Sequence, residues 1–215
     1  MGCKLCAGQQ HSRSHKLHPG MTSKHLPPIH LATLNTLDQE AFCDLLGGVV
    51  EHSPWVARKA WGDRPFASLE ALYNALARTI RQAPRSQQLA LLRVHPELAG
   101  SEATAGTMTA DSSSEQGRLG LLNLHPDDLA RLTDLNRRYR ERFGFPYVAA
   151  MRLHGSLADV FRCFEQRLHN DPETELAVSL LQVCEVMRGR LARTVLLETT
   201  APTLSLVSTP HRSLS

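Results

Sequence analysis

Residues 171–191 read DPETELAVSLLQVCEVMRGRL, and this stretch decides the fold class. Asp171 followed by Pro172 is typical of a helix start, because an Asp side chain caps free backbone N–H groups and proline fits the first helical position. Apolar residues then recur at helical spacing, at Leu176, Leu180, Val183, Met187 and Leu191. The stretch therefore predicts one long helix with a buried face.

The rest of the chain repeats this helical pattern. A second strong helix is predicted from Pro126 to Phe143, with Gly144 as its C-cap. Shorter helices are expected at about residues 37–46, 55–61, 69–80, 87–95 and 157–169, and near residue 112. No convincing pair of alternating strands is present. We therefore predict an all-α fold, a single compact multi-helix domain.

Three polar residues are expected to start helices. Thr36 with Gln39 three residues later resembles a capping box. Ser68 is expected to cap the helix that follows it, and Ser86 the helix that leads to residue 95.

Composition changes at both ends of this predicted domain. Residues 1–32 are rich in His, Ser, Gly and Lys and lack apolar periodicity, so they are predicted to form a disordered tail that contains Cys and His. The helical domain is predicted to span residues 33–197. Residues 198–215 are rich in Thr, Ser and Pro and are predicted to form a second disordered tail.

Composition and charge exclude several classes of protein. Hydrophobic residues make up 42% and charged residues 21% of the chain, as in globular proteins. No apolar run approaches the ~18 residues that cross a bilayer, so no membrane partner is predicted. The net charge is +3, but residues 1–30 contain four basic and no acidic residues, so the body carries about −1. Such a body has no basic surface for nucleic acid.

Cysteine usage and the start of the chain indicate a cytoplasmic protein. Cys43, Cys163 and Cys184 lie in apolar helical patterns and are predicted to be reduced core thiols. The first residues lack the apolar core of a signal peptide.

The N-terminal tail contains zinc-type ligands in an unusual spacing. Cys3 and Cys6 are followed by His11 and His15. Only four residues separate Cys6 from His11, whereas zinc fingers place about a dozen there. Metal binding by the tail is therefore not favoured. It remains part of an alternative function for the protein, a non-catalytic helical binding module with a basic tail that could bind metal.

A histidine at a helix end is the first candidate for chemistry. His95 follows the apolar run 89–94 and precedes Pro96, which disfavours helix at the residue before it. An imidazole aimed into a cavity from a helix end is suited to proton transfer. The alternative is a histidine that only satisfies the last carbonyls of its helix.

Three motifs together resemble a known family. They are HPELAG at residues 95–100, TMTADSSSEQ at 107–116 and FGFPYVAAMR at 143–152. Their order and spacing are similar to those of the 2-oxo-4-hydroxy-4-carboxy-5-ureidoimidazoline (OHCU) decarboxylase family, over roughly residues 33–197. The resemblance implies an all-α fold of this family's type and cofactor-independent decarboxylation of OHCU to S-allantoin in urate catabolism. It also implies a homodimer and neither a metal nor a cofactor.

The resemblance also implies the site residues. His95 would be the catalytic proton donor or acceptor, assisted by Glu115 and by Arg193 of the last helix, with Arg188 and Arg190 as alternatives to Arg193. The expected substrate-binding residues are Pro96, Ser112, Ser113, Ser114, Glu115, Gln116, Tyr147, Val148, Ala149, Ala150 and Met151. Without the resemblance, residues 112–116 would be read as a solvated helix start and residues 147–151 as a buried connector.

Overall fold

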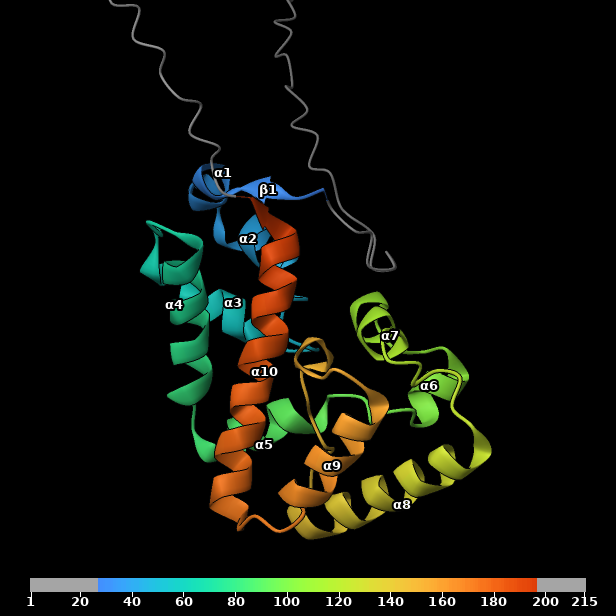
Figure 1. Ribbon diagram of the computed structural model, residues 1–215. Coiled ribbons are helices and arrows are strands. Elements are labelled where there is room, and N and C mark those ends of the chain that lie inside the picture. The colour runs from blue at the N-terminus through green and yellow to red at the C-terminus, as the bar shows by residue number, and fades with distance from the viewer. Residues whose placement is uncertain (1–26, 197–215) are drawn as a thin grey trace, which may run out of the picture.

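The computed structural model describes residues 27–196, and within them the chain forms ten α-helices (Figure 1). They are α1 (Leu31–Thr36), α2 (Gln39–Leu46), α3 (Pro54–Ala60), α4 (Leu69–Arg81), α5 (Arg85–Arg93), α6 (Ser101–Ala105), α7 (Ala110–Gly117), α8 (Pro126–Phe143), α9 (Leu157–Arg167) and α10 (Pro172–Thr194). Two 3₁₀ turns, η1 (Trp61–Asp63) and η2 (Met151–Leu153), complete the set. The prediction of an all-α domain is confirmed.

Helix α10 is the central element of the fold (Figure 1). Asp171 caps it by accepting hydrogen bonds from the backbone N–H groups of Glu173 and Thr174. The five apolar residues that predicted the helix are all buried. The helix packs against α4 and α5 through this face. Each fully buried Leu or Met contributes about 1.5–3 kcal/mol, so this stripe anchors the core.

Helix α8 ends at an aromatic cluster. Gly144 takes the left-handed conformation (φ 76°) expected of a C-cap glycine. Tyr139 then lies at the centre of aromatic side chains, with ring centroids 4.7 Å from Phe143, 5.4 Å from Tyr147 and 5.5 Å from Phe164. The cluster fastens α8 and α9 to the segment that follows residue 144.

Two predicted helix caps are wrong. Thr36 does not start a helix but ends α1, where its Oγ1 donates to the carbonyl of Thr33. Asp38 caps α2 instead, by accepting a hydrogen bond of 2.9 Å from the N–H of Ala41. Likewise Pro84 precedes the first residue of α5, and Ser86 lies inside that helix. Pro84 occupies the N-cap position, and within residues 27–196 no side chain caps α5. The cap predicted at Ser68 is confirmed.

Regular structure begins before the predicted domain start at residue 33. Strand β1 (Ile29–His30) pairs in parallel with β2 (Val195–Leu196), and Leu31 of α1 is buried. A strand of two residues has no alternating pattern, which is why the sequence did not indicate it. The predictions for residues 1–26 and 197–215, including the Cys and His ligands of the tail, lie outside the described residues. Within residues 27–196, no helix is both long and apolar enough to cross a membrane.

Candidate active site

A cavity lies where the end of α5, helix α7, the segment 147–151 and α10 meet. Its lining consists of His95, Pro96, Leu98, Ser112, Glu115, Gln116, Tyr147, Val148, Ala149, Met151, Val186 and Arg190. A neighbouring cavity of about 380 Å³ shares Glu115, Met151 and Val186 with it and also includes Ser114, Ala150 and Arg193. The two cavities together contain every site residue implied by the sequence except Ser113.

His95 is a buried neutral imidazole in the wall of this cavity. It lies just beyond the end of α5, and its Nδ1 is 2.8 Å from the carbonyl oxygen of Leu91. A carbonyl can only accept, so Nδ1 carries the proton and Nε2 keeps a free lone pair. Burial lowers the pKa of His95 to about 4. The ring is thus unprotonated at neutral pH, the form that can accept a proton from a substrate, and the carbonyl contact fixes its tautomer.

The loop after His95 is held by the side chain of Gln116. Its Oε1 accepts a hydrogen bond of 2.8 Å from the N–H of Ala99, and its Nε2 donates to the carbonyl of Glu97 at 3.2 Å. Ala99 has a φ of 47°, a left-handed conformation that costs a non-glycine residue roughly 1–2 kcal/mol. The Gln116 amide therefore stabilises a strained backbone beside the catalytic candidate.

Arg190 is the hub of the charged groups in the site. Its guanidinium contacts Glu115 through two nitrogens, Nε at 3.0 Å and Nη2 at 2.8 Å, and donates through Nη1 to Glu51 Oε2 at 2.8 Å. Ser112 donates to the same Glu51 oxygen at 2.9 Å. These contacts connect α7 to α10.

This arrangement keeps both ends of the Arg190–Glu51 pair charged. Burial raises the pKa of the Glu51 carboxyl, but the Arg190 charge and hydrogen bonds from Arg190, Thr109 and Ser112 outweigh it and the pKa is lowered overall. Burial lowers the pKa of Arg190, but its bonds to Glu115 and Glu51 outweigh that effect and raise it. All N–H groups of the Arg190 guanidinium are taken by Glu115, Glu51, Ser112 and the carbonyl of Gly48. Arg190 therefore fixes the Glu115 carboxylate in the wall of the cavity.

The sequence offered three arginines of the last helix, and the structure separates them: Arg188 pairs with Glu70 and lines neither cavity. Arg190 is 3% exposed and lines the His95 cavity. Arg193, the residue chosen from the sequence, is 53% exposed and lies in the neighbouring cavity. Its Nη2 donates to Asp111 at 2.9 Å and lies 3.5 Å from Glu115. The arginine of the inner cavity is therefore Arg190, one helical turn before Arg193.

The segment 147–151 forms the opposite wall. Tyr147 stacks on Phe164 with ring centroids 3.8 Å apart, and the carbonyl of Val148 accepts a hydrogen bond of 2.7 Å from Arg167. Within residues 27–196 no protein group accepts a hydrogen bond from the backbone N–H groups of residues 147–149. These three N–H groups are available to a ligand, whereas the side chains of residues 147–149 are buried in the protein.

Glu51 is a site residue that the sequence analysis missed. It is 2% exposed and touches Arg190, Thr109 and Ser112, residues distant in sequence. The available signal was weak: a single carboxylate between the apolar pair Val49-Val50 and the helix that starts at Pro54. Only the packing of α7 and α10 shows what it binds.

Comparison with known proteins identifies the family of the chain. The family model described as OHCU decarboxylase matches residues 35–192. The protein named 2-oxo-4-hydroxy-4-carboxy-5-ureidoimidazoline decarboxylase from Mus musculus is 44% identical over 161 residues, which are 75% of this chain and 90% of that protein. A protein of the same name from Halalkalicoccus jeotgali is 37% identical over 158 residues, 74% of this chain and 87% of that protein.

A solved structure agrees with the sequence comparisons. A crystal structure of (S)-allantoin synthase superposes with a TM-score of 0.62 at 25% identity and covers 78% of this chain. This chain spans 54% of the length of that synthase. Since the family model covers most of the domain and the relatives match over nearly their whole length, the chain belongs to the OHCU decarboxylase family.

Proposed function

We propose that this protein converts OHCU to S-allantoin and carbon dioxide in urate degradation, without a cofactor. One observation carries the proposal: a buried neutral imidazole, His95, shares a cavity with the Arg190–Glu115 ion pair. Relatives that match this chain over most of its domain bear the name of this enzyme.

The reaction places few demands on the protein. Loss of carbon dioxide leaves an electron pair on the carbon that held the carboxylate. The substrate accepts this pair itself, because that carbon neighbours a ring C=N bond, and an enol-like species results. The protein must orient the carboxylate, exclude water and deliver one proton to one face of that species.

The residues of the cavity suit these tasks. Nε2 of His95 can accept the proton of the substrate hydroxyl and return one to carbon. Arg190 holds Glu115 in place, and Glu115 can accept N–H bonds from the ureido group or the ring. The free N–H groups of residues 147–149 can bind a further oxygen. Arg193 is placed to contact the substrate from the outer cavity.

Formation of OHCU in situ from urate tests the proposal. Spontaneous decay of OHCU gives racemic allantoin, so the circular dichroism of the product separates catalysis from background. We expect the protein to accelerate decay and to yield optically active S-allantoin, with unchanged activity after exhaustive EDTA treatment. His95→Gln keeps a polar side chain but carries no proton, so its rate should fall at least ~10²-fold and its product should approach a racemate. Unaccelerated decay with the wild type would instead support the helical binding module.

The assembly and the location of the protein are further proposals. The family resemblance supports a homodimer, and the composition supports a cytoplasmic protein. Light scattering of the purified chain should give a mass close to twice the 23.8 kDa of one chain, and a monomer mass would exclude the dimer.

A further inference from the structure

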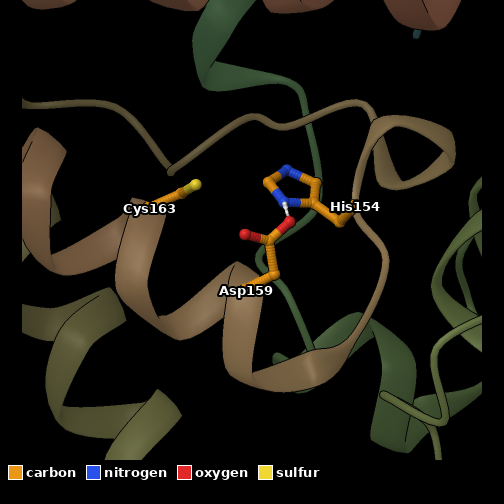
Figure 2. Close-up of side chains that lie close together, drawn as sticks. All are labelled: His154, Asp159 and Cys163. Atoms are coloured by element: carbon orange, nitrogen blue, oxygen red, sulfur yellow. Dashed lines mark hydrogen bonds and ion pairs between the residues drawn. The ribbon is translucent and has the colours of Figure 1, made fainter.

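A group of three potential metal ligands lies at the start of α9, outside both cavities described above (Figure 2). Asp159 and Cys163 are four residues apart on this helix, so their side chains share one face. His154 reaches the same place from the segment between η2 and α9. Their ligand atoms all lie within 4.8 Å of one another, and His154 Nδ1 is 3.1 Å from Asp159 Oδ2.

We propose that His154, Asp159 and Cys163 form a site for a divalent metal ion, zinc in particular. One imidazole nitrogen, one carboxylate oxygen and one thiolate make a mixed donor set of the kind that zinc accepts. Tetrahedral zinc with bonds of about 2.0–2.3 Å requires ligand atoms roughly 3.3–3.7 Å apart. The His154–Asp159 pair is already near this separation, and the Cys163 Sγ lies within 4.8 Å of both ligand atoms.

The surroundings of the group are compatible with a bound cation. Arg162 pairs with Asp159 Oδ1, which leaves Oδ2 directed at His154. The side chain of His154 is 10% exposed and that of Asp159 24%, so the ligands are held by packing while solvent retains access. Three protein ligands leave a fourth position for water.

Charge and protons balance on binding. The Cys163 thiol loses its proton to solvent, and the His154 proton moves from Nδ1 to Nε2, so that Nδ1 offers a lone pair. The thiolate and the Asp159 carboxylate then bring two negative charges to Zn²⁺, while Arg162 stays paired with Asp159 Oδ1. In the ion-free protein, the same Nδ1 proton makes the hydrogen bond to Asp159 drawn in Figure 2.

The sequence of the body indicated no metal site. The three residues combine a helical i, i+4 pair with a histidine from a preceding loop, which is not a standard zinc spacing. None of them lines the His95 cavity. The site is therefore expected to bind metal without taking part in decarboxylation.

Cobalt(II) titration of the full chain tests the proposal, because thiolate coordination to Co²⁺ gives an intense near-ultraviolet absorption. The reference protein is the Cys3→Ser/Cys6→Ser variant under reducing conditions, which removes the two tail thiols. We expect this protein to bind one Co²⁺ with the thiolate band, and Zn²⁺ to displace it. Cys163→Ala should abolish the band. His154→Gln should weaken Co²⁺ binding at least ~10-fold, since even outer-shell changes cost about 10–100-fold.

A matched cysteine variant provides the control. Cys43, like Cys163, is a partly buried free thiol on a helix, and Cys43→Ala should keep both the band and the affinity. Far-ultraviolet circular dichroism identifies the variants that fold. If Cys163→Ala does not fold, His154→Gln alone tests the proposal. Absence of the band in the reference protein, or an undiminished band and affinity in folded Cys163→Ala and His154→Gln, would overturn the proposal.

Discussion

Burial determines the chemistry of His95. An exposed histidine would be partly protonated near neutral pH, whereas this one is held neutral by desolvation. The Leu91 carbonyl fixes its tautomer and leaves Nε2 as the only basic atom of the ring. The residue is therefore a base before substrate arrives, and the proton that it later donates is one that it has taken from the substrate or from solvent.

The low pKa of His95 predicts a loss of stability in acid. Unfolded His95 binds a proton with a pKa near 6.5, and folded His95 only near 4. Between these values the unfolded state binds more protons, so the free energy of unfolding falls as the pH decreases. Urea denaturation at about pH 7 and about pH 4.5 should show a loss in the wild type that exceeds the loss in His95→Gln by roughly 2–3 kcal/mol. Equal losses in the two proteins would show that His95 titrates normally.

Arg190 and Arg193 provide a second residue-scale prediction. Arg190→Leu leaves two buried or half-buried carboxylates, Glu51 and Glu115, without their partner. Removing one member of a buried ion pair typically costs about 3–5 kcal/mol, so the variant should unfold at much lower urea concentration and lose activity. Arg193→Ala removes an exposed pair and should change stability by less than about 1 kcal/mol.

Activity then decides which arginine binds substrate. In folded protein, Arg193→Ala should reduce kcat/KM by no more than about tenfold, because its contact comes from the outer cavity. Glu115→Gln should cost roughly 1–3 kcal/mol of transition-state stabilisation, the size of a lost charged hydrogen bond. A larger activity loss in Arg193→Ala than in Arg190→Lys would show that Arg193 contributes more than Arg190 to the reaction.

At the scale of elements, α7 positions the loop after His95. Gln116 on this helix bonds to both Glu97 and Ala99, and Gln116→Ala would leave a left-handed alanine without support. We expect kcat/KM to fall about tenfold and stability to fall by about 1–3 kcal/mol. Gln166→Ala, on the exposed face of α9, is the control and should leave both unchanged. Full activity in Gln116→Ala would mean that Asn136, which donates to the carbonyl of Leu98, is sufficient to hold the loop.

Long helices could be predicted from the sequence, and short elements could not. Helices α8 and α10 each repeat their apolar pattern over several turns, which makes the period unambiguous. Helix α6 has five residues, none of them buried, so no pattern marks it within the Ser- and Thr-rich segment after Gly100. Several neighbouring residues can cap a helix, and the sequence does not show which one accepts the hydrogen bond. At the start of α2 it is Asp38 and not Thr36.

The candidate site was predictable as far as local motifs extend. His95 and residues 112–116 stand within short stretches that sequence alone can mark. Arg190 and Arg193 lie one turn apart on the same helix and differ in how deeply their side chains are buried. Burial depends on which other elements pack against the helix. Glu51 contacts Arg190 across 139 residues of sequence, which no local pattern contains.

At the scale of the whole molecule, the two ends of the domain are joined. Strand β1 pairs with β2 at the end of α10, so the segment at Ile29–His30 supports the helix that carries Arg190 (Figure 1). In sequence, every candidate site residue lies from Glu51 to Arg193, between the two paired strands. Stability at the N-terminus and chemistry at the cavity can therefore be tested separately by truncation.

Two truncations should give opposite results. A protein that begins at Met21 keeps β1 and α1 and should decarboxylate OHCU at the full-length rate, because residues 1–20 contain no candidate site residue. A protein that begins at Leu34 loses β1 and the buried side chain of Leu31. Its stability should fall by about 2 kcal/mol or more and its Tm by roughly 5–10 °C, measured by thermal unfolding. A tenfold loss of activity in the Met21 protein would place part of the active unit before residue 21, whereas an unchanged Tm in the Leu34 protein would show that α10 needs no support from β1.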